Sequence, residues 1–153
     1  MLLVVSVGFA HSKSYHGAIT PYISPGIQIG FNDQNSFFLS CQLTLGFGCK
    51  LGNHLEDTLP IFLGKTYGFR KSFIKNKSVE VLKYSDTQLA TPIGGIGRGY
   101  IYDSDGNSFK RRKYWIGGFG LICNEKIFYK DIIKSQFSIM VVLPFPIEML
   151  GAE

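Results

Sequence analysis

The residues best suited to bind a metal ion lie in one short polar segment. Asp103-x-Asp105-x-Asn107 places three oxygen side chains at alternating positions, as at the start of a calcium-binding loop. That pattern then requires Gly sixth and Glu twelfth, whereas this chain has Ser108 and Tyr114. Because Asp, Ser, Gly and Asn are turn residues, the segment predicts a polar hairpin loop and no metal site.

A glycine-rich segment could in principle cradle a phosphate group. Gly95-Ile96-Gly97-Arg98-Gly99 has the glycines for such a loop, but a dinucleotide site also needs a surrounding βαβ unit. No helical stripe of ten or more residues is readable anywhere in the chain. The glycines are therefore interpreted as strand residues that face a barrel wall or a neighbouring aromatic ring.

A basic run precedes two aromatic residues. The residues Lys110, Arg111, Arg112 and Lys113 stand directly before Tyr114 and Trp115. Cations with aromatic neighbours can bind nucleic-acid phosphates and stack bases. A basic surface near a membrane is the interpretation we prefer, and no nucleic-acid partner is expected.

Nothing else in the chain indicates catalysis. The three histidines, His11, His16 and His54, have no metal-ligand spacing, and no Ser-His-Asp or Cys-His arrangement can be placed. We therefore predict no enzyme activity, no catalytic residue, no bound metal and no cofactor. The cysteines number three, which excludes complete intramolecular pairing, and we expect Cys41, Cys49 and Cys123 to be unpaired apolar thiols.

The composition favours strands and turns over helices. Of 153 residues, 18 are Gly, about 12% against an average of roughly 7%, and 22 are aromatic. Gly and aromatic residues are poor helix formers, and aromatics are enriched in strands. The net charge of +5 requires no polyanionic partner, because excess Lys in loops accounts for it.

Residues 36–47, Ser-Phe-Phe-Leu-Ser-Cys-Gln-Leu-Thr-Leu-Gly-Phe, show the clearest alternation. Odd positions from Phe37 to Phe47 are apolar, and even positions carry only uncharged residues, most of them small. Successive side chains of a strand point to opposite faces, so this is one long strand with an apolar face. An outer strand of a soluble protein would usually show charge to water. Here the second face suits a crowded, wet interior.

Similar runs recur along the chain, separated by turn residues. Alternating or strand-like segments are expected at 27–31, 61–69, 79–88, 93–102, 110–123 and 136–145, with part of a strand in the charged stretch 124–134. Sequential hairpins without a helical crossover form an antiparallel meander. The fold class is therefore all-β, an up-and-down antiparallel β-barrel of about eight strands, which closes on itself and removes its edges.

Alternation alone does not say which face of the barrel is wet. In a soluble barrel the apolar face points inward, and in an outer-membrane barrel it faces lipid. The small residues on the second face of the strand favour the membrane arrangement, because a narrow eight-stranded barrel leaves room only for side chains or one small ligand. The candidate polar lumen residues are Gln42, Thr44, Thr66 and Arg98. Arg98 is expected to point into the lumen or to lie near a membrane interface, paired with Glu80 or Asp86, because an Arg facing lipid is costly.

Residues 22–147 resemble small eight-stranded outer-membrane β-barrel proteins of bacteria. The resemblance is carried by the Ser24-Pro25-Gly26-Ile27-Gln28-Ile29-Gly30-Phe31 opening, by Gly-aromatic strands such as Gly117-Gly118-Phe119-Gly120, and by short turns. It departs from that pattern at Pro144 and Pro146, which remove hydrogen-bond donors from the last strand, and in running on to Glu153.

The expected organisation is one domain behind a short leader. Residues 1–10 are uncharged and end in small residues, as a truncated export signal would, and residues 11–153 form the single β-barrel domain. The resemblance implies a bacterial outer-membrane location, the lipid bilayer as partner, and a structural, interaction or small-ligand role. Two alternatives remain: a soluble or periplasmic β-barrel that binds a small apolar ligand, and a β-rich nucleic-acid-binding domain using residues 110–115.

Overall fold

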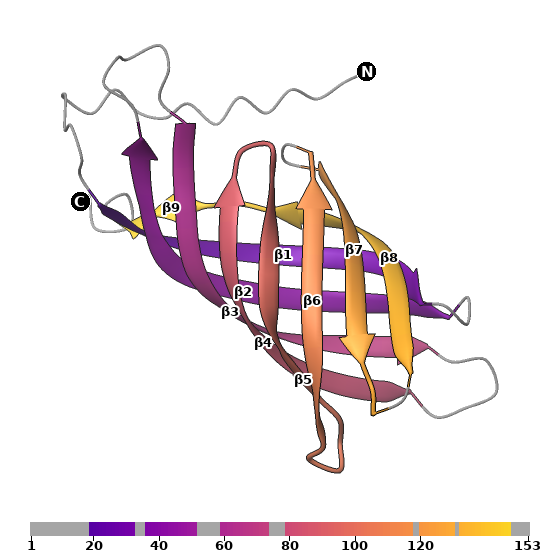
Figure 1. Cartoon of the computed structure of the whole chain (residues 1–153). Coiled ribbons are helices and arrows are strands. Elements are labelled where there is room, and N and C mark those ends of the chain that lie inside the picture. The colour runs from indigo at the N-terminus through magenta and orange to yellow at the C-terminus, as the bar shows by residue number, and fades with distance from the viewer. Residues whose placement is uncertain are drawn as a thin grey trace.

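The computed structural model describes residues 19–32, 36–51, 59–73, 79–117, 120–130 and 132–147, and most of them lie in strands (Figure 1). The strands are β1 (Thr20–Asn32), β2 (Phe37–Leu51), β3 (Leu59–Phe73), β4 (Glu80–Thr91), β5 (Gly94–Tyr102), β6 (Ser108–Ile116), β7 (Gly120–Phe128), β8 (Ile133–Val142) and the two-residue β9 (Phe145–Pro146). The possible signal segment, residues 1–10, and all three histidines lie outside the described residues.

Each strand pairs antiparallel with the next, and β1 pairs with both β2 and β8, so the sheet closes on itself. This confirms the predicted up-and-down barrel of eight strands. In Figure 1 strands β5, β6 and β7 stand upright at the front while β1 and β2 cross behind them. Such a crossing is what tilted strands produce when they wrap around one axis.

The register defines how strongly the strands tilt. One path of paired residues runs through Tyr22, Gly46, Gly64, Gln88, Gly97, Lys113, Glu125 and Gln136 and returns to β1 at Asn32. The path re-enters β1 ten residues from its start, so the barrel has a shear of ten. With standard strand spacings this corresponds to a tilt of about 40° and a height gain of about 2.5 Å per residue.

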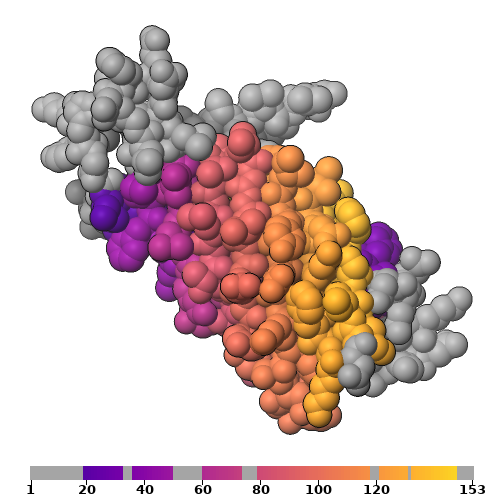
Figure 2. Space-filling model, in the orientation of Figure 1, coloured from indigo at the N-terminus to yellow at the C-terminus, as the bar shows by residue number. Residues whose placement is uncertain are grey.

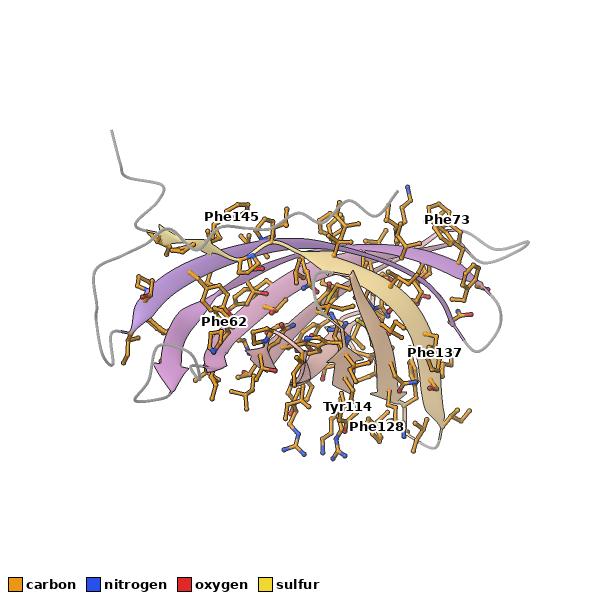
Figure 3. The ribbon with its side chains drawn as sticks, turned by 90° about the horizontal axis from the view of Figure 1, so that it is seen from above. Phe62, Phe73, Tyr114, Phe128, Phe137 and Phe145 are labelled. Atoms are coloured by element: carbon orange, nitrogen blue, oxygen red, sulfur yellow. The ribbon has the colours of Figure 1, made fainter. Side chains whose placement is uncertain are left out.

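Side chains alternate strictly between the lumen and the outside. In β8, for example, Gln136, Ser138 and Met140 are buried while Phe137 and Ile139 are exposed. Figure 3 shows Phe73, Tyr114, Phe128, Phe137 and Phe145 on the outside of the sheet, whereas Phe62 lies on its inner side. The apolar side chains that alternate through residues 37–47 therefore lie on the outside of the barrel.

The strand boundaries in the C-terminal part of the barrel differ from those expected from the sequence. The run 110–123 is not one strand, because the chain turns between β6 and β7, where Gly117 has φ 119°. The mixed stretch 124–134 contains the end of β7, a turn in which Tyr129 N–H donates to Ile132 O, and the start of β8. The closing strand stops at Val142, before Pro144, because proline cannot donate to the ladder.

The inward glycines provide space for large rings. A Cβ atom at Gly68 would lie 2.3 Å from the Tyr84 ring, and one at Gly95 would lie 2.4 Å from the Trp115 ring. Both rings come from the directly paired residue on the next strand. Gly is thus required where an aromatic side chain crosses a narrow lumen, which explains part of the high glycine content.

The contact between Gly68 and Tyr84 gives a stability prediction. Gly68→Ala should lower the free energy of unfolding by about 1–3 kcal/mol, because the added methyl group overpacks the lumen. Gly97→Ala is the matched control: it is also inward on a strand, but its Cβ would meet nothing closer than 3.5 Å. Urea titrations of both variants in detergent micelles test this. Equal losses of unfolding free energy in the two variants would show that contact with the Tyr84 ring is not what requires glycine at position 68.

Candidate functional site in the barrel lumen

The lumen holds a buried polar network at mid-height. Its members come from seven of the eight barrel strands, and they are Gln28, Ser40, Gln42, Arg70, Tyr84, Asp86, Arg111, Lys113, Glu125, Gln136 and Ser138. Their inward positions follow from strand parity. Sixteen polar or charged residues are buried inside the described structure, against ten hydrophobic ones, which is the reverse of a soluble core.

Glu125 lies at the centre of this network. Arg111 binds it as a fork, with Nε 3.1 Å from Oε2 and Nη2 2.8 Å from Oε1. Arg70 Nη2 donates to Glu125 Oε2 over 2.7 Å, and Gln28 Nε2 donates to Oε1. All three ionised side chains are fully buried. A carboxylate bound by two guanidinium groups is the arrangement that makes burial of these charges tolerable.

A second carboxylate and two rings complete the guanidinium contacts. Arg111 Nη1 donates to Asp86 Oδ2, and the Arg111 guanidinium lies 4.1 Å from the Tyr84 ring centroid. Arg70 lies 4.0 Å from the centroid of Phe38 and donates to Gln136. Cation–π contacts of this kind gain strength when water is excluded.

Lys113 is the one cation of this network that has no carboxylate partner among the described residues. Its Nζ donates to Gln42 Oε1 at 3.1 Å and Gln28 Oε1 at 3.3 Å, and it lies 2.9 Å from Met140 Sδ. With three cations and two carboxylates, the described lumen carries a formal excess of one positive charge. The amide oxygens therefore stabilise the Lys113 charge.

Strand β5 provides space to the network instead of a polar side chain. A Cβ at Gly99 would lie 2.7 Å from Asp86 Oδ1 and 1.9 Å from the backbone oxygen of Ser85. No other residue type could approach β4 this closely. The absence of a side chain on β5 leaves the Asp86 carboxylate room to meet Arg111.

A cavity of about 150 Å³ lies on one side of the network. It is lined by Tyr22, Ser24, Thr44, Phe62, Gln88, Ala90, Thr91, Pro92, Trp115, Leu121, Met140, Val142 and Pro144. Its walls are mostly apolar and carry no charged side chain. Gln88 is one of its few polar residues: it is buried, and its Nε2 has no hydrogen-bond partner within the described protein.

The two carboxylates of the network lie away from the cavity. Glu125 is bound on both oxygens and Asp86 on one, and neither lines the cavity. Within the described ranges no group of three or more His, Cys, Asp or Glu could hold a metal ion. The same ranges contain no helix long and apolar enough to cross a membrane.

The Asp103 segment forms the predicted hairpin turn. Its carboxylate accepts hydrogen bonds from Asn107 Nδ2 at 2.9 Å, from the Asn107 amide at 2.8 Å and from the Asp105 amide at 3.0 Å. The side-chain bond from Asn107 is the main reason that the pKa of Asp103 lies below its ordinary value. Both oxygens of the Asp103 carboxylate are therefore used within the turn.

Three of the four predicted lumen residues point inward. Gln42, Thr44 and Thr66 are 6%, 4% and 0% exposed, and the Thr44 and Thr66 hydroxyls are 2.6 Å apart. Arg98 is placed differently, because its position on β5 has outward parity and its side chain is exposed. Asp86 pairs with Arg111 instead, and Glu80 is exposed at the start of β4. Our expectation of a luminal Arg98 is therefore corrected.

The predicted basic surface is divided between the two faces. Lys110 and Arg112 are exposed on the outside, whereas Arg111 and Lys113 are fully buried in the lumen. A continuous strand alternates, so four consecutive basic residues cannot share one surface. The expectation held for two residues and missed the two that belong to the polar network.

Sequence reasoning also did not single out Arg70, Asp86 or Glu125 as partners of one another. Arg70 shares the parity of Thr66, and this alternation does place it inside the barrel, although it does not identify its partner. The three cysteines are free; Cys41 and Cys49 are half-buried and Cys123 is buried. No family model matches the chain, and no curated protein matches it.

The Glu125 contacts give a second stability prediction. Glu125→Gln removes the charge shared by Arg70 and Arg111, and leaving buried cations without a counter-charge should cost about 3–5 kcal/mol. Lys130→Ala is the control: it removes an exposed cation in the turn after β7 and should change stability by less than about 0.5 kcal/mol. Urea titration in detergent micelles measures both. A near-neutral Glu125→Gln would mean that the network does not stabilise the barrel.

Proposed function

We propose that the chain is a barrel of a bacterial outer membrane, with lipid around its outer surface and a lumen filled by side chains. Its role is that of a membrane-anchored structural or interaction protein, and the proposal includes no catalytic step. One observation carries it. Thirty large hydrophobic side chains are exposed in the described structure, while the three ion pairs among the described residues lie inside.

The exposed apolar residues cover the outer surface of several adjacent strands. Ile27, Ile29 and Phe31 on β1 are paired with Val141, Ile139 and Phe137 on β8, and Phe31 is also paired with Phe37 on β2. Soluble monomers rarely expose a continuous apolar patch above a few hundred Å². Figure 2 shows one continuous wall of adjacent strands on the face it presents.

Strand length supports the same proposal. At about 2.5 Å of height per residue, ten residues span about 25 Å, the height of the apolar band of a membrane barrel. Strands β1 to β4 have 12–15 residues, and β5 to β8 have 9 or 10. A soluble barrel with this exterior would require a partner covering most of its circumference.

Lipid contact at Leu43 tests the proposal. The only tryptophan, Trp115, lines the cavity, so we would replace it with Phe and introduce Leu43→Trp on the outer face. After refolding with phosphatidylcholine vesicles, bromine atoms on the acyl chains should quench this tryptophan strongly. The control is Asn107→Trp in the exposed turn, which should be quenched much less. A protein that stays in the aqueous phase, with no quenching at position 43, would contradict membrane insertion.

A second candidate function is binding of a small apolar molecule in the cavity. Cavities of about 150 Å³ with apolar walls hold a ligand of about the size of benzene. The unpartnered Gln88 Nε2 adds one hydrogen-bond donor. The ligand class is therefore a single ring, or a short chain, with one acceptor oxygen.

Two six-membered ring compounds, one with an acceptor oxygen and one without, test whether the cavity binds such a ligand. Cyclohexanone should bind about five- to tenfold more tightly than methylcyclohexane, because Gln88 can donate to the ketone oxygen. Ligand-observed NMR on the folded protein measures both. Gln88→Leu should remove the preference, and Ala90→Phe should block both ligands by filling the cavity. If Gln88→Leu retains the preference, or neither ring binds, this assignment is wrong.

A further inference from the structure

Three cations form a row across the outer surface of the barrel. Arg98 on β5 is paired directly with Arg112 on β6, and Arg112 is paired directly with Lys126 on β7. All three side chains are exposed. Adjacent strands lie about 4.8 Å apart, so the backbone positions of these three positive charges fall within roughly 10 Å.

The row crosses the barrel at half-height. Arg98 is the fifth of the nine residues of β5, and Arg112 is the fifth of the nine residues of β6. At about 2.5 Å of height per residue, both lie roughly 10 Å from either end of their strands. In the proposed membrane barrel this is the middle of the apolar band, where lipid phosphates do not lie and where an exposed Arg or Lys is most destabilising.

The described part of the barrel does not neutralise this row. Among the outward-facing strand residues that the structure describes, none is Asp or Glu. The ion pairs of the described residues lie in the lumen, and the Arg112 guanidinium lies 5.2 Å from the Phe128 ring centroid. Like charges directly opposite each other in a sheet are destabilising. Lipid chains leave that repulsion in place, whereas carboxylates of a second protein remove it.

Uncharged polar residues extend the row at both ends. Thr87 on β4 is the partner of Arg98, and Ser135 on β8 is the partner of Lys126; both are exposed. Asn124 on β7 lies beside the row, with its Nδ2 3.5 Å from Ser135 Oγ. Hydroxyl and amide groups need hydrogen-bond partners, which lipid chains lack and a protein surface has. Figure 3 shows nitrogen-tipped side chains projecting outward below the labels of Tyr114 and Phe128.

The outer surface of β4 to β7 forms a basic face that differs from the rest of the wall. Besides the row it carries Lys83 on β4 and Lys110 on β6, both exposed. The described outward strand positions of β8, β1 and β2 carry no charge. The front strands in Figure 1 and Figure 2 carry the basic face, and β1 crosses behind them in Figure 1. Lipid chains suit the apolar strands, and the basic face needs a different cover.

The basic face is large enough for a specific protein contact. Strands β5, β6 and β7 have nine residues each, and with β4 they form a wall of about 19 Å by 30 Å, or roughly 570 Å². A contact over this wall buries roughly 1,100 Å² in total, above the approximately 1,000 Å² expected of a biological interface.

A second copy of this chain does not supply the cover. Two copies that meet through the same face place cations against cations, because a two-fold contact uses the same residues on both sides. None of the other described outward strand positions offers a carboxylate. The charge of the face therefore selects a different protein as its partner.

We propose that the basic face docks a different membrane protein whose contact surface carries carboxylates at half-height. These carboxylates pair with Arg98, Arg112 and Lys126, and the partner keeps lipid away from the row. Charge-assisted hydrogen bonds of this kind are strong where water is excluded. The inference rests on the proposed function, because it names the partner of that interaction role and requires insertion into a bilayer. Lipid then covers the apolar strands.

The first test measures what the row costs the barrel without a partner. In phosphatidylcholine vesicles, Arg98→Leu/Arg112→Leu/Lys126→Leu should raise the ratio of folded to unfolded protein at least about 100-fold, because apolar side chains replace cations in hydrocarbon. The control Lys130→Leu changes an exposed cation in the turn after β7 and should shift the ratio less than about threefold. Urea titration measures both. An unchanged or lower ratio in the triple variant would mean that lipid does not disfavour the row, and it would overturn the inference.

A charge-reversed copy of the barrel is the probe for an acidic partner. Arg98→Glu/Arg112→Glu/Lys126→Glu places three carboxylates on the same wall with the spacing of the row. Energy transfer between labelled proteins in phosphatidylcholine vesicles should show that the native chain binds this probe at least about tenfold more tightly than it binds itself. The triple leucine variant should lose that preference. The control Lys65→Leu removes an exposed cation on β3 and should retain it.

The outcomes of the probe experiment separate the possible partners. Equal binding of the probe to the native chain and to the triple leucine variant, or to neither, would overturn the role of the row. Native chains that bind each other as tightly as they bind the probe would replace the acidic partner with a second copy. Insertion, measured by quenching at position 43, reports the proposed function separately. Normal insertion of native chain and probe without the preference contradicts this inference alone.

Discussion

The shared binding of Glu125 by Arg70 and Arg111 is the interaction on which the interior of this barrel depends. An eight-stranded barrel with a shear of ten has a lumen wide enough only for side chains or one small ligand. Charges enclosed there lose hydration and must find partners across the barrel. The guanidinium fork, the second carboxylate of Asp86 and the amide groups of Gln28 and Gln42 provide those partners. The strands are thus joined through the lumen as well as along the ladders.

Glycine and aromatic residues make that interior possible in such a small diameter. The rings of Tyr84 and Trp115 cross toward Gly68 and Gly95 on neighbouring strands, and the Tyr84 ring also covers Arg111. The same principle applies to Gly99, whose missing side chain leaves room for the Asp86 carboxylate. The outer surface differs from the lumen, because its apolar side chains need an apolar environment but no specific partner. The charged exceptions among the described strand residues are all cations, and they lie on β3 to β7.

Alternation of apolar and small polar residues was sufficient to predict the all-β barrel, its approximate strand number and the inward placement of Gln42, Thr44 and Thr66. It also placed Cys41 on the apolar parity. The prediction was wrong for Arg98, because charge was given more weight than parity. It was wrong for Arg111 and Lys113, because a run of basic residues was treated as one surface. Strict parity would have placed all three correctly.

The sequence by itself therefore determined the period of two, the turn sites and the assignment of side chains to two faces. These are local properties, since each depends on a residue and its immediate neighbours. Only the tertiary structure decided which residues meet across the barrel. Glu125 lies 55 residues from Arg70, and their contact depends on closure and on the shear accumulated over eight pairings. The row formed by Arg98, Arg112 and Lys126 has the same origin: register is a property of paired strands, and no single segment encodes it.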